Sequence, residues 1–257
     1  MHIGQAILYG ALQGISEFLP ISSSGHIVLL QRLWQVNAPP LLLDVSLHTG
    51  TLAALVFAFR KDLIDLVRHP RDPLWRHLLA GTVPTVAIAL WFQPWIETAF
   101  ATGQMLGAEF LLTGLLLLLA ETRSGLYSGR IGLSQAFLIG CAQGAAILPA
   151  LSRSGLTMSA AIGLGVKREE AVRFSFLLSI PALLGATMFA FKNAGSTLQQ
   201  VFTPMLLLAV LISALTGYLA IRFLLKWVSR HSVRPFGYYT VGLGVLLLLN
   251  QWWWHLF

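Results

Sequence analysis

Long hydrophobic blocks run through this chain, separated by short polar or proline-containing segments. A membrane-spanning helix needs about 20 mostly apolar residues, and six blocks approach or exceed that length. The pattern therefore predicts an all-α fold with about six transmembrane helices. They lie at roughly 43–60, 75–95, 104–121, 171–191, 203–228 and 236–256.

Four further hydrophobic blocks are too short or too interrupted to span a bilayer. They form two pairs, and each pair is joined by a polar break that contains proline, at residues 20–25 and 149–155. Backbone that leaves a helix at membrane depth cannot face lipid, so each break should be buried in protein or line a cavity. We therefore expect two re-entrant helical hairpins. Their helices lie at roughly 3–19, 24–36, 133–148 and 155–166.

The two halves of the chain, roughly 1–121 and 131–257, resemble each other. Matches this short also arise by chance in an apolar chain, but three in order at nearly one offset favour a true repeat. Each half holds one hairpin and three spans, and because three is odd, the second half should be inverted. We expect one membrane domain, 1–257, with a binding site between inverted repeats. The matches are Gln13-Gly14 with Gln143-Gly144, Ser22 to Gly25 with Ser152 to Gly155, and Phe57 to Arg60 with Phe189 to Lys192.

The composition agrees with a membrane protein and excludes two other classes. Hydrophobic residues make up 56% of the chain and charged residues 11%. Soluble domains have about 25% charged residues, and disordered chains combine low hydrophobicity with high charge. The net charge of +7 does not indicate a nucleic-acid partner, because no basic run is interleaved with aromatic residues. The first residues lack the basic region and cleavage site of a signal peptide, so none is expected. The single cysteine, Cys141, is expected to pack in an apolar stretch.

Basic residues are distributed unevenly over the expected loops. The side of the N-terminus carries only Arg32 and Lys192, and Arg153 lies in the second break. Because cytoplasmic loops are rich in Lys and Arg, both termini should lie outside the cytoplasm, with the hairpin tips near the midplane. Trp252 to Trp254 then fit the outer aromatic belt. The other 14 of the 17 basic residues are Arg60, Lys61, Arg68, Arg71, Arg76, Arg123, Arg130, Lys167, Arg168, Arg173, Arg222, Lys226, Arg230 and Arg234.

Two ionisable residues, Glu17 and Arg153, stand beside the breaks. A charge at membrane depth is costly, so such residues indicate a functional site unless they only neutralise each other. Each break also starts a helix, whose free N–H groups and positive dipole end suit a phosphate. The Arg153 guanidinium can bind a phosphate through two parallel hydrogen bonds. Serines in membrane helices also bond to their own backbone, which is the alternative reading. The other expected phosphate contacts are Ser22, Ser24, Gly25, Ser152, Ser154 and Thr157.

Two pairs of side chains in the first hairpin suggest chemistry. Ser23 and His26 are three residues apart and share a helix face, which is the spacing of a nucleophile and its base. A lone histidine near a helix start is also commonly structural. Gln13 and Glu17 are four residues apart, so their oxygens can hold a hard divalent cation against phosphate oxygens. Charge neutralisation, positioning and an activated oxygen are the requirements of phosphoryl transfer.

These residues carry a resemblance to a known family. Residues 13–26, QGISEFLPISSSGH, resemble the first signature of the undecaprenyl-diphosphate phosphatase family, also called the bacitracin-resistance family. Residues 149–157, PALSRSGLT, resemble its second signature, and the similarity extends over essentially the whole chain. Two positions depart from the family pattern. Gln13 replaces a glutamate, which would weaken metal binding, and Ala150 stands where glycine is usual.

The resemblance implies an enzyme of the bacterial inner membrane that removes the terminal phosphate of undecaprenyl diphosphate. Its product is the monophosphate carrier lipid for peptidoglycan synthesis, and its activity confers bacitracin resistance. The resemblance also implies a divalent metal, Mg or Ca, an active site open to the periplasm, and an inverted-repeat helical bundle that is often a homodimer. Its acidic motif maps to Gln13 and Glu17, its serine and histidine to Ser23 and His26, and its essential arginine to Arg153.

We therefore expect a hydrolase that acts on an isoprenoid lipid diphosphate within membrane lipids. Ser23 is the expected nucleophile with His26 as base or proton shuttle, while phosphorylation of His26 and direct attack by water stay open. The alternative function is a lipid-phosphate transporter or flippase without hydrolysis, because inverted repeats with broken helices are typical of transporters. An enzyme that also returns the lipid across the membrane is a third reading. Asp44 and Glu109 lie near span ends and are left without a role, as solvated interfacial acids.

Overall fold

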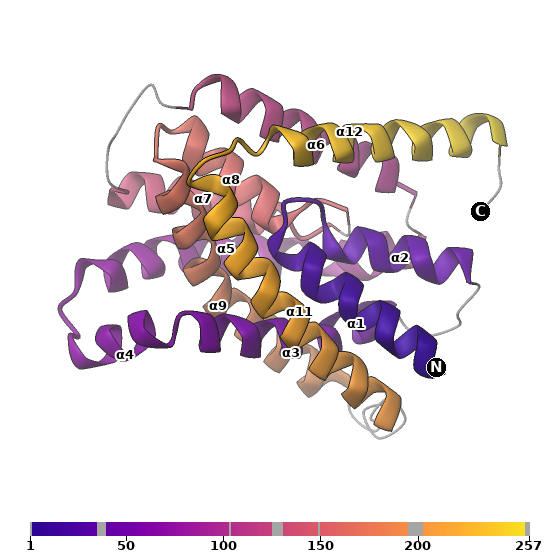
Figure 1. Cartoon of the computed structure of the whole chain (residues 1–257), viewed down its shortest axis with the longest axis horizontal. Helices are drawn as coiled ribbons and strands as arrows, with labels where there is room; N and C mark the ends of the chain where they lie inside the picture. The colour runs from indigo at the N-terminus through magenta and orange to yellow at the C-terminus, as the bar shows by residue number, and fades with distance from the viewer. Residues whose placement is uncertain are drawn as a thin grey trace.

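The computed structural model describes residues 2–34, 40–102, 104–124, 131–148, 150–194 and 203–254. Within these ranges the chain is helical and contains no β-strand, which confirms the predicted all-α class. Pro149 and Arg130 lie outside the described residues, as do the side chains of Trp253 and Trp254. The helices (Figure 1) are α1 (Ile3–Phe18), α2 (Ser23–Leu33), α3 (Pro40–Ala58), α4 (Arg60–Arg68), α5 (Pro73–Thr102), α6 (Leu106–Thr122), α7 (Leu133–Ala145), α8 (Arg153–Gly163), α9 (Arg168–Ala194), α11 (Pro204–Val228), α12 (Arg234–Leu249) and the π-helix η1 (Asn250–Trp254).

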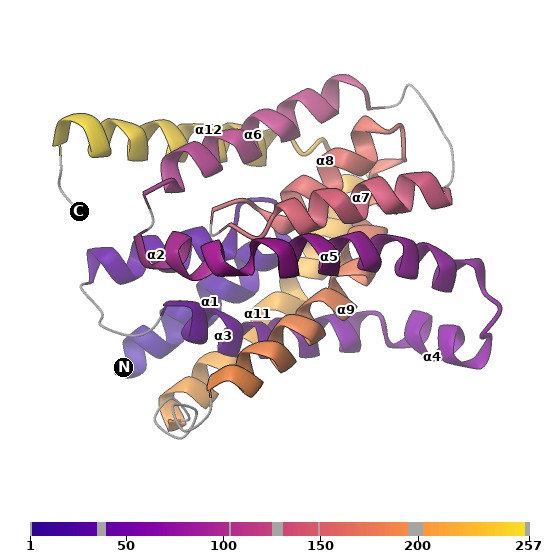
Figure 2. The same ribbon diagram turned by 180° about the vertical axis from the view of Figure 1, so that it is seen from behind.

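Helices α1 and α2 form one helix–turn–helix unit, and α7 and α8 form a second. Helix α1 has 16 residues and α7 has 13, while α2 and α8 have 11 each. At a rise of 1.5 Å per residue they are about 16–24 Å long, which is shorter than the ~30 Å apolar core of a bilayer. Both turns lie near the middle of the long axis of the molecule (Figures 1 and 2). Because these helices are short, α1 and α7 end, and α2 and α8 begin, inside the bundle.

Helix α4 was not predicted from the hydrophobic blocks, which left the segment after residue 60 as a loop. It is a nine-residue helix with Asp62 in its first turn and Arg68 in its last. Both charges complement the helix dipole. One side chain, Leu66, is buried, and its carbonyl accepts a hydrogen bond of 2.8 Å from Trp75 Nε1. A short charged helix of this kind escapes a search for long apolar runs.

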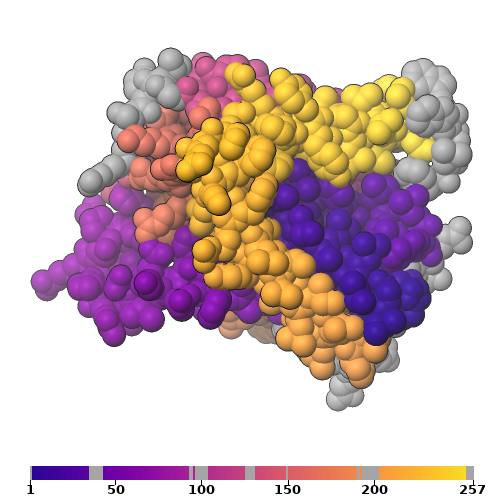
Figure 3. All heavy atoms as spheres, in the orientation of Figure 1, coloured from indigo at the N-terminus to yellow at the C-terminus, as the bar shows by residue number. Residues whose placement is uncertain are grey.

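Glycines bring several helix pairs into close contact. A Cβ at Gly10 of α1 would lie 2.3 Å from the Ala209 carbonyl oxygen of α11. A Cβ at Gly140 of α7 would lie 2.1 Å from the Gly81 carbonyl oxygen of α5. Both distances are far below van der Waals contact, so any larger residue would force the helices apart. Figure 3 shows α1 lying alongside α11 on one face of the molecule.

Helices α6 and α12 cross through two glycine pairs. Gly107 faces the carbonyl oxygen of Gly244, and Gly244 faces that of Gly107. Gly114 and Gly237 are paired in the same reciprocal way. The crossing therefore has a local two-fold arrangement, in which each helix offers the same kind of surface to the other.

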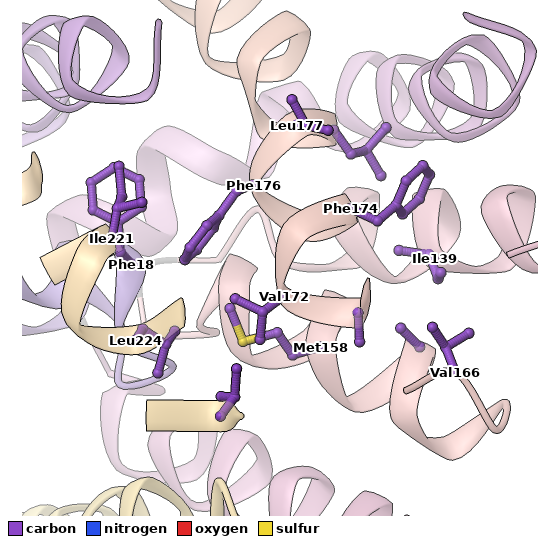
Figure 4. Close-up of a cluster of buried hydrophobic side chains, with 14 of the residues drawn as sticks. Phe18, Ile139, Met158, Val166, Val172, Phe174, Phe176, Leu177, Ile221 and Leu224 are labelled. Atoms are coloured by element: carbon purple, nitrogen blue, oxygen red, sulfur yellow. The ribbon is translucent and has the colours of Figure 1, made fainter. Parts of the chain in front are cut away.

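The main hydrophobic core joins α1, α3, α7, α8, α9 and α11, and Figure 4 shows part of it, around Phe18 and Phe176. Phe18, the last residue of α1, meets Phe176 of α9 edge to face, with ring centroids 5.3 Å apart. Phe59 packs on the same ring at 6.2 Å. Aromatic pairs in this geometry add about 0.5–1.5 kcal/mol to their buried area. The core thus holds the end of α1, and with it the first turn, in a set position.

Large apolar side chains also cover the outside of the bundle. Trp91 is 78% exposed, and Leu211 is 68% exposed. Two helical segments among the described residues combine the length and apolar composition needed to cross a bilayer, Arg168–Phe189 and Pro204–Val228. Exposed apolar surface on this scale is expected for a protein whose outer surface contacts lipid rather than water.

Candidate active site

The turn between α1 and α2 contacts the turn between α7 and α8. Ser154 Oγ donates a hydrogen bond of 3.2 Å to the Leu19 carbonyl oxygen. A Cβ on Gly25 would lie 2.9 Å from Ala150, so only glycine allows the two turns to approach this closely. The tips of the two helical hairpins therefore meet, and the side chains that they carry form one cluster.

Serine N-caps begin α2 and α8, as the break sequences predicted. Ser22 Oγ accepts a hydrogen bond of 3.3 Å from Gly25 N, and Ser152 Oγ accepts one of 3.0 Å from Gly155 N. Ser22 has φ 70° and is the one non-glycine residue with positive φ in the described part of the chain. Such a conformation costs about 1–3 kcal/mol and is found mainly at functional sites. The strained cap sets the direction in which Ser23 leaves the turn.

Glu17 lies at the centre of the cluster, and it is 5% exposed. Its Oε1 forms an ion pair with Arg153 Nη2. Its Oε2 accepts hydrogen bonds from Ser23 Oγ at 2.5 Å and from Gln13 Nε2 at 3.0 Å. His48 Nε2 lies 3.1 Å from the same oxygen. One carboxylate thus connects side chains from α1, α2, α3 and α8.

Arg153 uses only part of its guanidinium group on Glu17. Its Nη1 is buried and has no hydrogen-bond partner. A buried donor without a partner costs about 1–3 kcal/mol, and more when it is charged, unless a ligand satisfies it. Arg153 is also the first residue of α8, so the helix dipole adds to its positive charge. The geometry therefore provides a site for an anion.

His26 lies at the edge of the cluster and does not face Ser23. Its Nδ1 is 2.5 Å from the Ser22 carbonyl oxygen, and its Nε2 is 2.7 Å from the Tyr239 hydroxyl of α12. The ring stacks on Tyr239 at 5.8 Å and meets Phe110 edge to face at 5.1 Å. Both ring nitrogens thus have partners other than Ser23. The residue that receives the Ser23 hydrogen bond is Glu17.

Two residues of α3, Asp44 and His48, belong to the cluster although the sequence interpretation gave them no role. Asp44 is 4% exposed, so the expectation of a solvated interfacial acid is wrong. Its Oδ2 accepts a hydrogen bond of 3.0 Å from Ser24 Oγ. His48 lies one helical turn later and contacts both Asp44 and Glu17. An acid and a histidine four residues apart inside an apolar span were the sequence signal for this pair.

The remaining hydroxyl groups bond to one another and to nearby backbone in and after the second turn. Ser152 Oγ lies 3.2 Å from Ser154 Oγ. Thr157 Oγ1 donates to the Arg153 carbonyl oxygen at 2.8 Å and lies 2.5 Å from Ser175 Oγ of α9. These contacts follow the alternative reading, in which hydroxyls bond to nearby backbone and to one another.

Glu109 is also a buried acid, with 4% exposure. Its Oε2 accepts a hydrogen bond of 2.8 Å from Ala150 N in the second turn. A glutamate on α6 thus satisfies a backbone donor that the break in helix geometry leaves without an intrahelical partner. Its position indicates a structural role in holding the second turn.

Gln13 and Glu17 do not offer a divalent cation a set of free oxygens in this arrangement. Both oxygens of Glu17 already face donors, and Gln13 Oε1 is buried without a partner. Hard cations take six or more oxygen ligands, or keep several waters. Among the described residues no group of three or more His, Cys, Asp or Glu side chains is arranged to hold a metal ion. The predicted metal ligands, Gln13 and Glu17, therefore do not form a cation site in this arrangement.

Comparison with known proteins agrees with the motifs. The family described as "Bacitracin resistance protein BacA" matches residues 6–246. The chain is 41% identical to "Undecaprenyl-diphosphatase" of Carboxydothermus hydrogenoformans, over 98% of each chain. It is 40% identical to "Undecaprenyl-diphosphatase 4" of Bacillus thuringiensis subsp. konkukian, over 96% of each chain. The match to "Undecaprenyl-diphosphatase" of Korarchaeum cryptofilum is 36% identical over 96% of this chain. The chain therefore belongs to the bacitracin resistance protein BacA family.

Proposed function

We propose that this protein is a membrane phosphatase that hydrolyses undecaprenyl diphosphate to undecaprenyl phosphate and inorganic phosphate. The observation that carries the proposal is the contact of three groups at the meeting turns: a serine hydroxyl, the carboxylate that accepts its hydrogen bond, and an arginine with a free donor. Membership of the family and the names of its relatives support the same substrate. The product returns the carrier lipid to peptidoglycan synthesis, which links the activity to bacitracin resistance.

In this proposal the diphosphate lies beside the point where the two turns meet, against Arg153 and Ser23. Arg153 Nη1 binds a phosphate oxygen, and the helix N-termini at Ser23 and Arg153 direct further backbone N–H groups and dipoles at it. These donors neutralise charge that accumulates on the phosphoryl oxygens during transfer. The caps Ser22 and Ser152 keep both N-termini in place. Exposed apolar helix surfaces beside the turns leave the isoprenoid tail in the membrane.

Ser23 is the proposed nucleophile, and Glu17 is the group placed to take its proton. Ser23 Oγ forms a bond to the terminal phosphorus, and the bond from that phosphorus to the bridging oxygen breaks. The leaving group is the lipid monophosphate, which keeps the bridging oxygen. Water then hydrolyses the phosphoserine, releases inorganic phosphate and restores the hydroxyl. Direct attack by water, with Ser23 as a positioning group, is the competing form of the same reaction.

His26 keeps a place in the proposal as a proton shuttle, in a different position from the one expected. It approaches the first turn from the side of Tyr239, with Nε2 directed at the tyrosine hydroxyl. A proton that passes through His26 would therefore be exchanged with Tyr239 rather than with Ser23. This arrangement separates the activation of Ser23, on the Glu17 side, from proton supply on the Tyr239 side.

Dependence on Mg or Ca is proposed from the family resemblance alone. The protein side chains do not form a ready set of ligands around Glu17, as described above. Magnesium in phosphoryl-transfer sites is commonly held by substrate phosphates together with one or two carboxylates. A cation that enters with the diphosphate is therefore compatible with the cluster, and it would supply charge neutralisation for the phosphate groups.

We also propose that the chain forms six membrane spans and two re-entrant hairpins arranged as an inverted repeat. Equivalent residues at an offset of 130 support this. Ser23 and Arg153 each begin a short helix after a break. Gly10 and Gly140 each sit at a close helix crossing, α1 with α11 and α7 with α5, which exchange under the repeat. The glycine pairs between α6 and α12 are reciprocal in the same way.

The proposed orientation places both termini and the opening of the site on the periplasmic side of the inner membrane. Figure 1 shows the start of α1 and the end of α12 at one end of the long axis and α4, with its basic residues, at the other. A homodimer is proposed from the family resemblance.

The orientation is tested with single cysteines in a Cys141→Ser background. A membrane-impermeant thiol reagent should label Ile3→Cys in intact spheroplasts and Arg71→Cys only after permeabilisation, and the reverse pattern would contradict the orientation.

The function is tested by measuring phosphate release from purified protein supplied with undecaprenyl diphosphate in detergent. Wild type should release one phosphate per lipid, while Glu17→Ala and Arg153→Ala should not. Arg173→Ala is the control, because Arg173 forms an exposed ion pair with Asp62 outside the cluster. Absence of release from wild type under all conditions would contradict the phosphatase and favour a transporter. Activity in either cluster variant would contradict the site.

A further inference from the structure

His48 supports Glu17 from a third side. Glu17 Oε1 is drawn towards Arg153, while Oε2 receives the Ser23 hydroxyl at 2.5 Å. His48 Nε2 lies 3.1 Å from Oε2, on the same oxygen as Ser23. Without this contact, only Gln13 Nε2, at 3.0 Å from Oε2, would oppose the pull of Arg153 on the carboxylate. The carboxylate would then turn more easily, and Oε2 would move away from the serine.

The orientation of the His48 ring is set within α3. Its Nδ1 lies 2.7 Å from the Asp44 backbone oxygen and 3.5 Å from Asp44 Oδ2. A carbonyl oxygen only accepts hydrogen bonds, so Nδ1 is the donor. Glu17 also accepts at the other nitrogen. Both ring nitrogens therefore face acceptors, and a ring that satisfies both carries a proton on each.

Asp44 connects this pair to the first turn. Its Oδ2 accepts the hydroxyl of Ser24, the residue next to Ser23. The side chains of Asp44 and His48 thus hold both partners of the proposed reaction step, one through Ser24 and the other through Glu17. Their burial, 4% exposure for Asp44 and 13% for the His48 side chain, limits competition from water.

We propose that His48, oriented by Asp44, is a positioning residue that keeps Oε2 of Glu17 directed at Ser23. This inference rests on the proposed phosphatase function. It assigns no contact with the substrate to His48. Its effect is on the geometry of the reacting pair, so it should change the rate of the chemical step and leave lipid binding nearly unchanged.

The test compares two substitutions of His48 with a matched control. His48→Ala should lower kcat by about 100-fold, the effect of displacing a reacting group by roughly 1 Å, with KM within a few-fold of wild type. His48→Gln should recover much of kcat, because its amide nitrogen can donate where Nε2 does. His69→Ala is the control, because His69 has the same local bond, Nδ1 to the Asp65 carbonyl oxygen at 2.9 Å, and is an exposed residue that caps the C-terminal end of α4. It should match wild type.

Three results would overturn the inference. The first is wild-type kcat in His48→Ala, and the second is a His48→Gln variant as slow as His48→Ala, which would require the histidine for proton transfer. The third is a loss confined to KM, which would indicate substrate binding. Gel filtration and circular dichroism check that each variant is folded. If His48→Ala does not fold, Asp44→Asn is tested instead, because it removes the negative charge that faces His48 Nδ1. We expect a several-fold lower kcat, and an unchanged kcat would contradict the inference. Failure of wild type to release phosphate would instead reject the proposed function.

Discussion

Arg153 and Glu17 are 136 residues apart in the chain and form a largely buried ion pair where two helical turns meet. Taking both charges out of water is costly, and their attraction offsets this only in part. A pair of this kind is weak support for stability by itself. Its value here is that it joins the two halves of the protein at the point where a serine and a free arginine donor lie together.

Removal of one member of this pair should reduce both stability and activity. Arg153→Met leaves Glu17 buried without its counter-charge, which typically costs about 3–5 kcal/mol. The double variant Glu17→Met with Arg153→Met should recover most of that loss and remain inactive. Thermal unfolding in detergent and phosphate release measure the two effects separately. A double variant that is as unstable as the single one would show that the pair does more than neutralise charge.

Ser23→Ala should abolish formation of a phosphoenzyme. Wild type quenched during turnover should carry phosphate on Ser23, detected by mass spectrometry of the peptide. Ser229→Ala is a suitable control, because Ser229 is exposed and its hydroxyl donates to the nearby Lys226 carbonyl oxygen, outside the cluster. An active Ser23→Ala enzyme would favour direct attack by water. So would a single turnover in labelled water that releases labelled phosphate while no phosphoserine is detected.

Tyr239→Phe should slow the reaction without stopping it. The substitution removes the hydroxyl 2.7 Å from His26 Nε2 and leaves the ring that stacks on the histidine. Loss of a partner from a nearly buried group costs about 1–3 kcal/mol. Tyr238→Phe is the matched control, since Tyr238 is the neighbouring residue and its side chain is 63% exposed. Equal rates for Tyr239→Phe and wild type would remove the proposed proton path through His26.

Gly140→Ala should destabilise the protein, whereas Gly185→Ala should not. A Cβ at Gly140 would meet backbone atoms of Gly81 at 2.1 Å, so α5 and α7 must separate. A Cβ at Gly185, inside α9, meets nothing within 4 Å. Alanine is favoured over glycine within a helix by about 0.5–1 kcal/mol, so this variant should gain slightly in stability. Melting temperatures in one detergent provide the comparison, and equal effects at both sites would contradict the close crossing.

Gln13→Glu should strengthen the response to divalent cations. It replaces an amide that donates to Glu17 Oε2 at 3.0 Å with a second carboxylate, and two like charges at that distance favour either a shared proton or a bound cation. The concentration of Mg needed for half-maximal phosphate release should therefore fall relative to wild type. Chelator should stop release by both proteins, and added Mg or Ca should restore it. An unchanged requirement for Mg would place any cation away from residue 13.

Much of the fold was predictable because it depends on local sequence. Apolar block length and the two proline-containing breaks predicted the short helices of both hairpins, and Ser22 and Ser152 act as the expected caps. Helix α4 was missed because its apolar face is short and its charge is high. The metal requirement, the span count and the periplasmic orientation stay predictions from sequence.

The partners within the site were less predictable. Spacing by three residues places Ser23 and His26 on one helix face, but it does not determine where either side chain turns. In the folded protein Ser23 meets Glu17, while His26 turns to Tyr239, a residue 213 positions away. His48 joined the cluster through α3, an apolar span in which its spacing of four residues from Asp44 was the one sequence signal.

By itself, therefore, the sequence determined the helical class, the two breaks, the motif residues and the family to which they point, because helix length, proline breaks and caps are set by neighbouring residues. Only the tertiary structure decided that Glu17 receives the serine and that Asp44 and His48 support it. Such contacts depend on how closely helices from distant parts of the chain approach. That approach is set by glycine crossings and core packing, which no local pattern encodes.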